Sequence, residues 1–263
     1  MSTEVVNPAV EVHDLTVSYD RKPVLWDIDF SVPAGCLAGI IGPNGSGKTT
    51  LIKAIMGLVP INSGYVKLFN KSVAEVRTQV SYIPQRETVD WNFPASVKDV
   101  VMMGRYGKRG LFRRLTAEDE NMVHECLKKV GMADLANRQI ARLSGGQQQR
   151  IFLARALAQD ALLYLMDEPF NGIDATTEED IMNILREMRL KGKTILVVHH
   201  DLQSAMEYFD WFILLNTRLV AYGPRKEVFT PHLLQETYGG RLSLLTQISD
   251  LLKEKDFPMR ETG

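Results

Sequence analysis

Cysteine is scarce in this sequence, because only Cys36 and Cys126 occur among 263 residues. They are too far apart for a C-x-x-C metal motif and too few for a disulfide framework, so we expect two ordinary buried thiols in a reducing compartment. No apolar run approaches the roughly 18–20 residues that a membrane-spanning helix needs. The first ten residues show no basic segment followed by an apolar one. These absences predict a soluble chain without a secretory signal.

An excess of charge is also lacking. The formal net charge is −1, which gives no reason to expect binding to nucleic acid. One basic run with interleaved aromatic residues, 104–114, could by itself bind an anionic surface, although a solvated loop is the simpler interpretation. The 45% of hydrophobic residues suffices for a full core. We therefore expect a globular protein that does not bind nucleic acid.

One glycine-rich stretch lies between an apolar run, 36–41, and a helical pattern, 51–56. It consists of Gly42, Pro43, Asn44, Gly45, Ser46, Gly47, Lys48, Thr49 and Thr50. A strand, a glycine turn and a helix form the setting of a phosphate-binding loop, and this setting argues against a chance match. Backbone N–H groups and the helix N-terminus would surround the phosphates, with Lys48 on the β- and γ-phosphates and Thr49 on Mg²⁺. The stretch predicts a nucleoside triphosphate site.

The hydrophobic periodicity predicts the order of the elements. We expect strands at 10–19, 24–32, 36–41, 64–69, 80–83, 161–166, 194–198, 211–215 and 219–222, and helices at 51–56, 97–103, 116–130, 147–159, 176–190, 202–208 and 242–252. The strand-rich beginning and the later alternation of strands and helices indicate an α/β fold. It has a P-loop NTPase core with a mainly parallel sheet, an N-terminal antiparallel β subdomain and a helical subdomain inserted at about 86–160. The domain covers 9–240, and a helical tail covers 241–263.

Two further motifs follow. A buried strand ends in Asp167 and Glu168, where a P-loop protein holds Mg²⁺ on the first carboxylate and a general base on the second. Two solvated acids would be the alternative without a phosphate loop. The turn formed by Ser144, Gly145, Gly146 and Gln147 opens a helix and can present N–H groups to a phosphate. One chain has no second phosphate for it, so we expect a dimer with ATP between the two copies.

These three motifs, in this order, resemble those of the ATP-binding subunits of ABC transporters. The resemblance covers about 10–240 and includes the five-residue LSGGQ at 143–147. It implies that Tyr19 stacks on adenine and that Gln85 senses the γ-phosphate or Mg²⁺. It also implies that Asp174 meets the opposite subunit, although the stretch 171–174 departs from the commoner Ser-Ala-Leu-Asp and keeps only the Asp.

The stretch His199-His200-Asp201 could suggest a metal site. Adjacent residues at a strand end point to opposite sides, however, and no other ligand stands at a useful spacing. The resemblance assigns His200 to the γ-phosphate, and His199 replaces a more usual Thr. His13, His124 and His232 have no partners that the sequence identifies.

The segments 91–94 (Trp-Asn-Phe-Pro) and 103–107 (Met-Gly-Arg-Tyr-Gly) are similar to those of manganese, zinc and iron importers. The resemblance implies an ATPase that binds ATP and Mg²⁺ and forms a homodimer at the cytoplasmic face of the inner membrane. It would contact a permease there and serve a metal-binding protein indirectly. An importer of a metal chelate (siderophore, haem or cobalamin) and a soluble ABC ATPase outside transport are the alternatives.

Overall fold

The first of two sheets is antiparallel. The computed structural model describes residues 7–20, 22–109 and 115–239. This sheet has the strand order β2-β1-β4-β5. Its strands are β1 (Pro8–Tyr19), β2 (Lys22–Pro33), β4 (Ser63–Leu68) and β5 (Lys71–Ser72). Alternating side chains of β1 and β2 are buried, as expected when one face of a sheet is solvated.

The second sheet has the order β10-β9-β3-β8-β7-β6 and is parallel except for β10. Its strands are β3 (Leu37–Ile41), β6 (Val80–Ile83), β7 (Leu163–Asp167), β8 (Thr194–Val198), β9 (Trp211–Asn216) and β10 (Arg218–Pro224). Every residue of β3, β7 and β8 is buried, which requires cover on both faces. Parallel strands bring their carboxyl ends to one edge, so the segments after β3, β6, β7 and β8 meet there.

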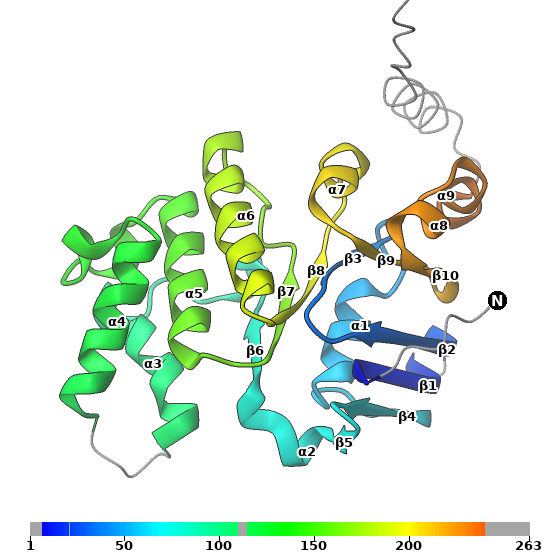
Figure 1. Cartoon of the computed structure of the whole chain (residues 1–263), viewed down its shortest axis with the longest axis horizontal. Helices are drawn as coiled ribbons and strands as arrows, with labels where there is room; N and C mark the ends of the chain where they lie inside the picture. Colours follow the sequence, from blue (N-terminus) through cyan, green and yellow to red (C-terminus); the bar gives the residue numbers. More distant parts are fainter. Residues whose placement is uncertain (1–6, 21, 110–114, 240–263) are drawn as a thin grey trace, which may run out of the picture.

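Three helices form a group of their own beside the second sheet, on the left of Figure 1. They are α3 (Val97–Arg109), α4 (Ala117–Lys129) and α5 (Gly145–Gln159), and they pack on one another. The chain enters the group from β6 and leaves it into β7, which are neighbouring strands. Thr116 caps α4, because its side chain accepts a hydrogen bond from the Asp119 N–H.

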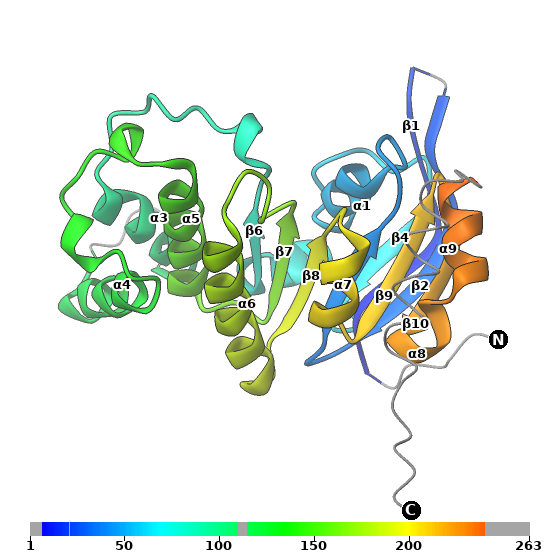
Figure 2. The same cartoon turned by 90° about the horizontal axis from the view of Figure 1, so that it is seen from above.

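Among the remaining helices, α1 (Lys48–Ile55) packs against strands of both sheets, and the others lie around the sheets (Figures 1 and 2). These others are α2 (Val73–Val76), α6 (Ala175–Leu190), α7 (Leu202–Tyr208), α8 (Arg225–Val228) and α9 (Pro231–Tyr238), with short 3-10 turns at Arg77–Gln79, Arg86–Thr88, Ala133–Leu135 and Ile140–Arg142. No helix within the described residues has the length and apolar character needed to cross a membrane.

The parallel sheet separates two hydrophobic cores. Along β8, Ile195 and Val197 belong to the core beneath α3–α7, whereas Leu196 and Val198 belong to the core shared with α1 and the antiparallel sheet. This division follows from the two-residue period of a strand. Strand β8 thus contributes side chains to both cores, one on each face of the parallel sheet.

The predicted architecture is confirmed: an α/β fold with a mainly parallel sheet, an N-terminal antiparallel sheet and helices between β6 and β7. The described helices α3–α5 lie within the expected insertion, 86–160. The short elements β5 and α2 and the helices α8 and α9 were not predicted. The tail expected at 241–263, with its helix at 242–252, lies outside the described residues.

Candidate active site

The phosphate loop joins β3 to α1, and its shape depends on glycine. Gly47 has φ +98°, and a Cβ at this position would lie 2.6 Å from the Leu25 side chain and 2.9 Å from the Val24 carbonyl oxygen. The start of β2 is therefore packed directly against the loop. Because a side chain at Gly47 would collide with β2 and strain the backbone, the loop can follow this path only with glycine there.

A turn late in the chain also holds the loop. The Thr217 N–H donates to the Ser46 carbonyl at 3.0 Å, and the Thr217 carbonyl accepts from the Trp26 N–H at 2.9 Å. Thr217 lies between β9 and β10 and has φ +61°. Its role was not predicted, because backbone hydrogen bonds leave no pattern in the sequence. One residue thus connects the phosphate loop, β2 and the β9–β10 turn.

The Lys48 ammonium lies over the loop. Its Nζ donates to the carbonyl oxygens of Gly42 at 2.8 Å and Pro43 at 2.9 Å. Burial lowers the pKa of Lys48, while the nearby carboxylates of Glu168 and Asp167 act in the opposite direction. The ammonium is buried and its hydrogen bonds go to neutral carbonyl oxygens, so an incoming anion would stabilise its charge, which suits a phosphate-binding role.

A cavity of about 420 Å³ opens in front of the loop. Its lining residues are Val24, Asn44, Gly45, Ser46, Gly47, Lys48, Thr49, Thr50, Gln85 and Glu168. Gln85 reaches it from the segment after β6, and Glu168 from the end of β7. The structure thus brings the predicted phosphate loop, Gln85 and Glu168 together at the carboxyl edge of the parallel sheet.

Asp167 is buried behind Thr49, which lines the cavity. The Thr49 hydroxyl donates to Asp167 Oδ1 at 3.1 Å, while Asp167 Oδ2 is buried and has no hydrogen-bond partner within the described residues. Burial raises the pKa of Asp167 and the Glu168 carboxylate adds to this, against the hydrogen bond from Thr49. An unpaired buried carboxylate oxygen beside a hydroxyl is a donor set that fits a hard divalent cation.

Glu168 has an unusual backbone. Its φ is +50°, the left-handed region that non-glycine residues rarely adopt. In a regular strand, the step from Asp167 would carry the next side chain to the opposite face. The left-handed turn instead places the half-buried Glu168 on the cavity wall. Strain of this kind at a polar residue is common in active sites.

The two histidines after β8 have different surroundings. His199 is buried against Phe170 and Phe209, and its Nε2 lies 2.7 Å from the Ser204 hydroxyl. Ser204 donates its proton to Asp201 at 2.6 Å, so His199 is the donor to Ser204. Burial lowers the pKa of His199 to about 4, so this imidazole is neutral at physiological pH. His200 is exposed and does not line the phosphate cavity.

Tyr19 also lies outside the cavity lining. It ends β1 opposite Lys22, and its side chain is 46% exposed. The same hairpin contacts the phosphate loop through Val24 and Leu25. Tyr19 therefore lies on the strand pair that packs against the loop, with its ring at the surface.

The turn with Ser144 lines a second cavity, of about 460 Å³, apart from the first. Ser144 Oγ accepts from the Gln147 N–H at 3.3 Å, and Gln147 Oε1 accepts from the Ser144 N–H at 3.0 Å, which forms a capping box. Asp174 caps α6 nearby by accepting from the Thr177 N–H at 2.9 Å. The hydrogen bonds from Thr177 lower the pKa of Asp174. The amino ends of α5 and α6 thus open into one cavity, which Gly145, Gly146, Gln147 and Asp174 also line.

Arg86 joins the segment after β6 to the first turn of α5 and was not predicted. It follows Gln85, its Nε donates to Gln148 Oε1 at 3.2 Å, and its guanidinium lies about 3.0 Å from where a Gly145 Cβ would be. The signal in the sequence was its position directly after Gln85. The guanidinium thus contacts the first turn of α5 directly from the segment that carries Gln85.

The comparisons with known proteins agree in one family. The model of the ABC transporter family matches residues 25–171. The manganese transport system ATP-binding protein MntB of Bacillus subtilis (strain 168) is 58% identical over 236 residues, which is 90% of this chain and 94% of that protein. The zinc transport system ATP-binding protein TroB of Treponema pallidum (strain Nichols) is 53% identical over 235 residues, which is 89% and 88% of the two chains.

Solved structures agree with this result. A structure described as the ATP-binding subunit of an ABC transporter has a TM-score of 0.75 and 27% identity, and the match covers 93% of this chain and 99% of that one. For cbiO1 from Clostridium perfringens, described as part of the ABC transporter complex cbiONQ, the TM-score is 0.74 and the identity 25%, over 93% and 100% of the two chains. The chain described here belongs to the ABC transporter family, as an ATP-binding subunit that hydrolyses ATP as part of a membrane transporter with permease subunits.

Proposed function

We propose that this chain energises an importer that takes up a divalent transition metal: manganese, zinc or iron. The observation that carries the proposal is the extent of the likeness, since two relatives named for manganese and zinc transport match about nine tenths of this chain at more than half identity. Uptake of a metal chelate such as a siderophore, haem or cobalamin remains the alternative, because other subunits select the cargo.

The first step of the proposed hydrolysis is binding of the triphosphate. Backbone N–H groups of the loop and Lys48 hold the β- and γ-phosphates, and Tyr19 stacks on adenine at the surface. Thr49, Asp167 and Gln85 would hold Mg²⁺, which neutralises charge on the transferred phosphoryl group when it is bound. The buried Oδ2 of Asp167 and its pairing with Thr49 support this assignment.

Glu168 is the proposed general base. Its carboxylate lines the same cavity as Lys48 and Gln85, where it can accept a proton from the water that attacks the γ-phosphate. His200 contacts the γ-phosphate from the loop after β8. Neutral His199 holds that loop through Ser204 and Asp201.

The complete site is proposed to need a second copy of the chain. In each chain, the cavity at the amino ends of α5 and α6 is separate from the cavity at the phosphate loop. Two copies facing each other would place the partner's turn, 144–147, on the γ-phosphate, where helix N-termini favour negative charge. Asp174 would lie at the boundary between the copies. Such a homodimer binds two ATP molecules.

The permease is proposed to bind a groove of about 350 Å³ between the helical group and the sheets. The lining includes the exposed side chains of Leu58 and Met103 beside Arg77 and Arg155. Nearby, Trp91 is a structural residue, because its Nε1 donates to the Arg86 carbonyl at 2.9 Å and its ring packs on Phe152. The permease would hold the chain as a peripheral subunit at the cytoplasmic face of the inner membrane. A metal-binding protein would deliver the cargo to the permease.

Metal uptake by cells that lack this chain tests the cargo. We expect loss of uptake of at least one of manganese, zinc and iron, with recovery on expression of the wild-type chain and none with Lys48→Ala. Uptake of siderophores, haem and cobalamin is measured in the same cells, and loss of one of these activities would indicate the alternative, a metal-chelate importer. Unchanged uptake of all three metals would refute the proposal.

A further inference from the structure

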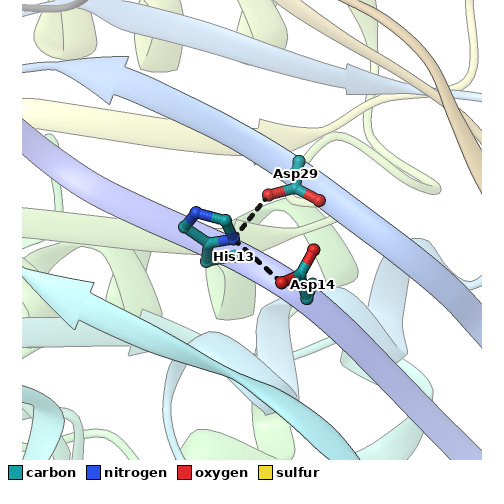
Figure 3. A group of neighbouring side chains, drawn as sticks. All are labelled: His13, Asp14 and Asp29. Carbon is teal, nitrogen blue, oxygen red and sulfur yellow. Dashed lines mark ion pairs between the residues drawn. The ribbon is translucent and has the colours of Figure 1, made fainter.

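A group of potential metal ligands lies on the solvated face of the antiparallel sheet, and none of its residues lines the cavity at the phosphate loop. His13 and Asp14 come from β1 and Asp29 from β2 (Figure 3). His13 Nδ1 lies 2.9 Å from Asp29 Oδ1 and 3.4 Å from Asp14 Oδ2. Figure 3 shows both carboxylates turned toward the same ring nitrogen. Within the described residues, no other group of three His, Cys, Asp or Glu side chains lies this close together.

A β-bulge brings two neighbouring residues to one side. Val12 pairs with Phe30 and Leu15 with Ile28, so His13 and Asp14 together oppose Asp29 alone. In a regular strand, consecutive side chains would lie on opposite faces. Asp14 has φ +47°, and this left-handed residue turns its carboxylate to the side of His13. Bulges frequently redirect a side chain in this way.

The third strand, β4, holds the bulge from its other side. The backbone oxygens of His13 and Asp14 approach Gly64 so closely that a Cβ on Gly64 would overlap them. The Ser63 hydroxyl donates to the Asp14 carbonyl at 3.3 Å, and the His13 ring packs on Tyr65 with 5.3 Å between ring centroids. The imidazole is therefore oriented by its neighbours before any ligand binds.

The distances match those between ligands of a single ion. Metal–ligand bonds are about 2.0–2.2 Å long, which puts two neighbouring ligands about 2.8–3.1 Å apart in an octahedral site and about 3.3–3.6 Å apart in a tetrahedral one. The two measured separations from Nδ1 fall at these values. The two separations belong to different ideal geometries, so a cation that replaces the Nδ1 proton would bind after small rotations of these exposed side chains, with the strands in place.

The donor set decides the class of ion. Two carboxylates alone would suit hydrated Mg²⁺ or Ca²⁺, whereas imidazole favours zinc and its neighbours in the first transition row. We propose that His13, Asp14 and Asp29 bind a divalent first-row transition ion, with water filling the remaining positions. The two carboxylates balance its charge. The proposal is independent of which cargo the transporter carries.

The test measures binding of Mn²⁺ to the nucleotide-free full chain by the loss of the spectrum of free aqueous Mn²⁺ in electron paramagnetic resonance. We compare the wild type with His13→Gln and Asp29→Asn, in the presence of excess Mg²⁺. His124→Gln serves as control, because His124 is an exposed histidine on α4. All proteins keep Asp167, so binding at the nucleotide site contributes equally to each.

We expect the wild type and His124→Gln to bind one more ion than the two site variants, or to bind it at least about tenfold more tightly. Mn²⁺ should also raise the melting temperature of the wild type more than that of His13→Gln. ATP binding should be the same in all four proteins, which shows that the variants are folded. Equal Mn²⁺ binding in all four would overturn the proposal, as would a loss on Asp29→Asn without a loss on His13→Gln.

Discussion

Replacement of Glu168 by Gln tests the core of the proposed mechanism. The change keeps the size of the side chain and removes its charge and basicity. The backbone at φ +50° is equally strained for both residues. Because the phosphate loop, Thr49 and Asp167 are unchanged, the residues that hold ATP remain in place. The variant therefore separates binding from hydrolysis.

The size of the effect follows from the position of Glu168. As a general base on the cavity wall it should contribute about 10²–10⁴-fold to the rate, equivalent to about 3–5.5 kcal/mol of barrier. Affinity for ATP should change in the opposite direction. The Glu168 charge lies close enough to Lys48 and Asp167 to shift the pKa of both, so it also repels the phosphates. Glu168→Gln should bind ATP at least as tightly as the wild type.

The assay combines two measurements. Phosphate release with saturating MgATP gives the rate, and size-exclusion chromatography with ATP gives the oligomeric state. We expect slow release and accumulation of a dimer. Glu179→Gln is the matched control, because Glu179 is exposed on α6 and its loss should leave rate and dimer unchanged. An undiminished rate in Glu168→Gln would remove Glu168 from its role, and a slow monomer that binds ATP would refute the proposed dimer.

Three further predictions concern the surroundings of the site. Arg86→Gln, which loses the 3.2 Å contact to Gln148, should lower the hydrolysis rate roughly tenfold at unchanged ATP affinity, and an unchanged rate would contradict the proposed link. Burial lowers the pKa of His199 from 6.5 to about 4, so only the unfolded chain gains this proton as pH falls through that range. Between pH 6.5 and 4 the free energy of unfolding, measured with urea, should fall by about 3 kcal/mol less in His199→Gln than in the wild type. Parallel plots of the unfolding free energy against pH for the two proteins would contradict this. Gly64→Ala should lower the free energy of unfolding, measured with urea, by about 2–3 kcal/mol, because Gly64 has φ +85° and lies close to the His13 carbonyl. An unchanged urea midpoint would show that the bulge adjusts to the new side chain.

Local patterns predicted the framework well. Buried strands such as 163–167 and 194–198 are apolar except for Asp167 and Thr194 at their ends, and the phosphate loop has a fixed spacing, so both can be identified from short windows of sequence. The unpredicted helix α9 had a local signal too, because Thr230 caps it and Pro231 occupies its first turn. Helix α9 was therefore missed because its sequence pattern is short, and not because tertiary contacts determine it.

Other features depend on contacts that a single sequence does not reveal. Asp29 could not be paired with His13 from the sequence, because the pairing results from a bulge that shifts the register of β1 against β2. The proximity of Arg86 to α5 depends on how the helical group packs beside the sheet. The burial of Asp167 Oδ2 likewise depends on how the parallel strands assemble at their carboxyl edge.

The hydrogen bonds of Thr217 bear on how much chain forms a working unit. The match to the family model ends at residue 171, and the motif residues end at His200. The support of Ser46 and the pairing of β3 with β9 come from later residues. A fragment that stops after His200 would therefore keep every motif and lose the scaffold of its phosphate loop. The smallest fragment that can form the phosphate loop must include the backbone hydrogen bonds that hold the loop. It therefore extends beyond the last recognisable motif.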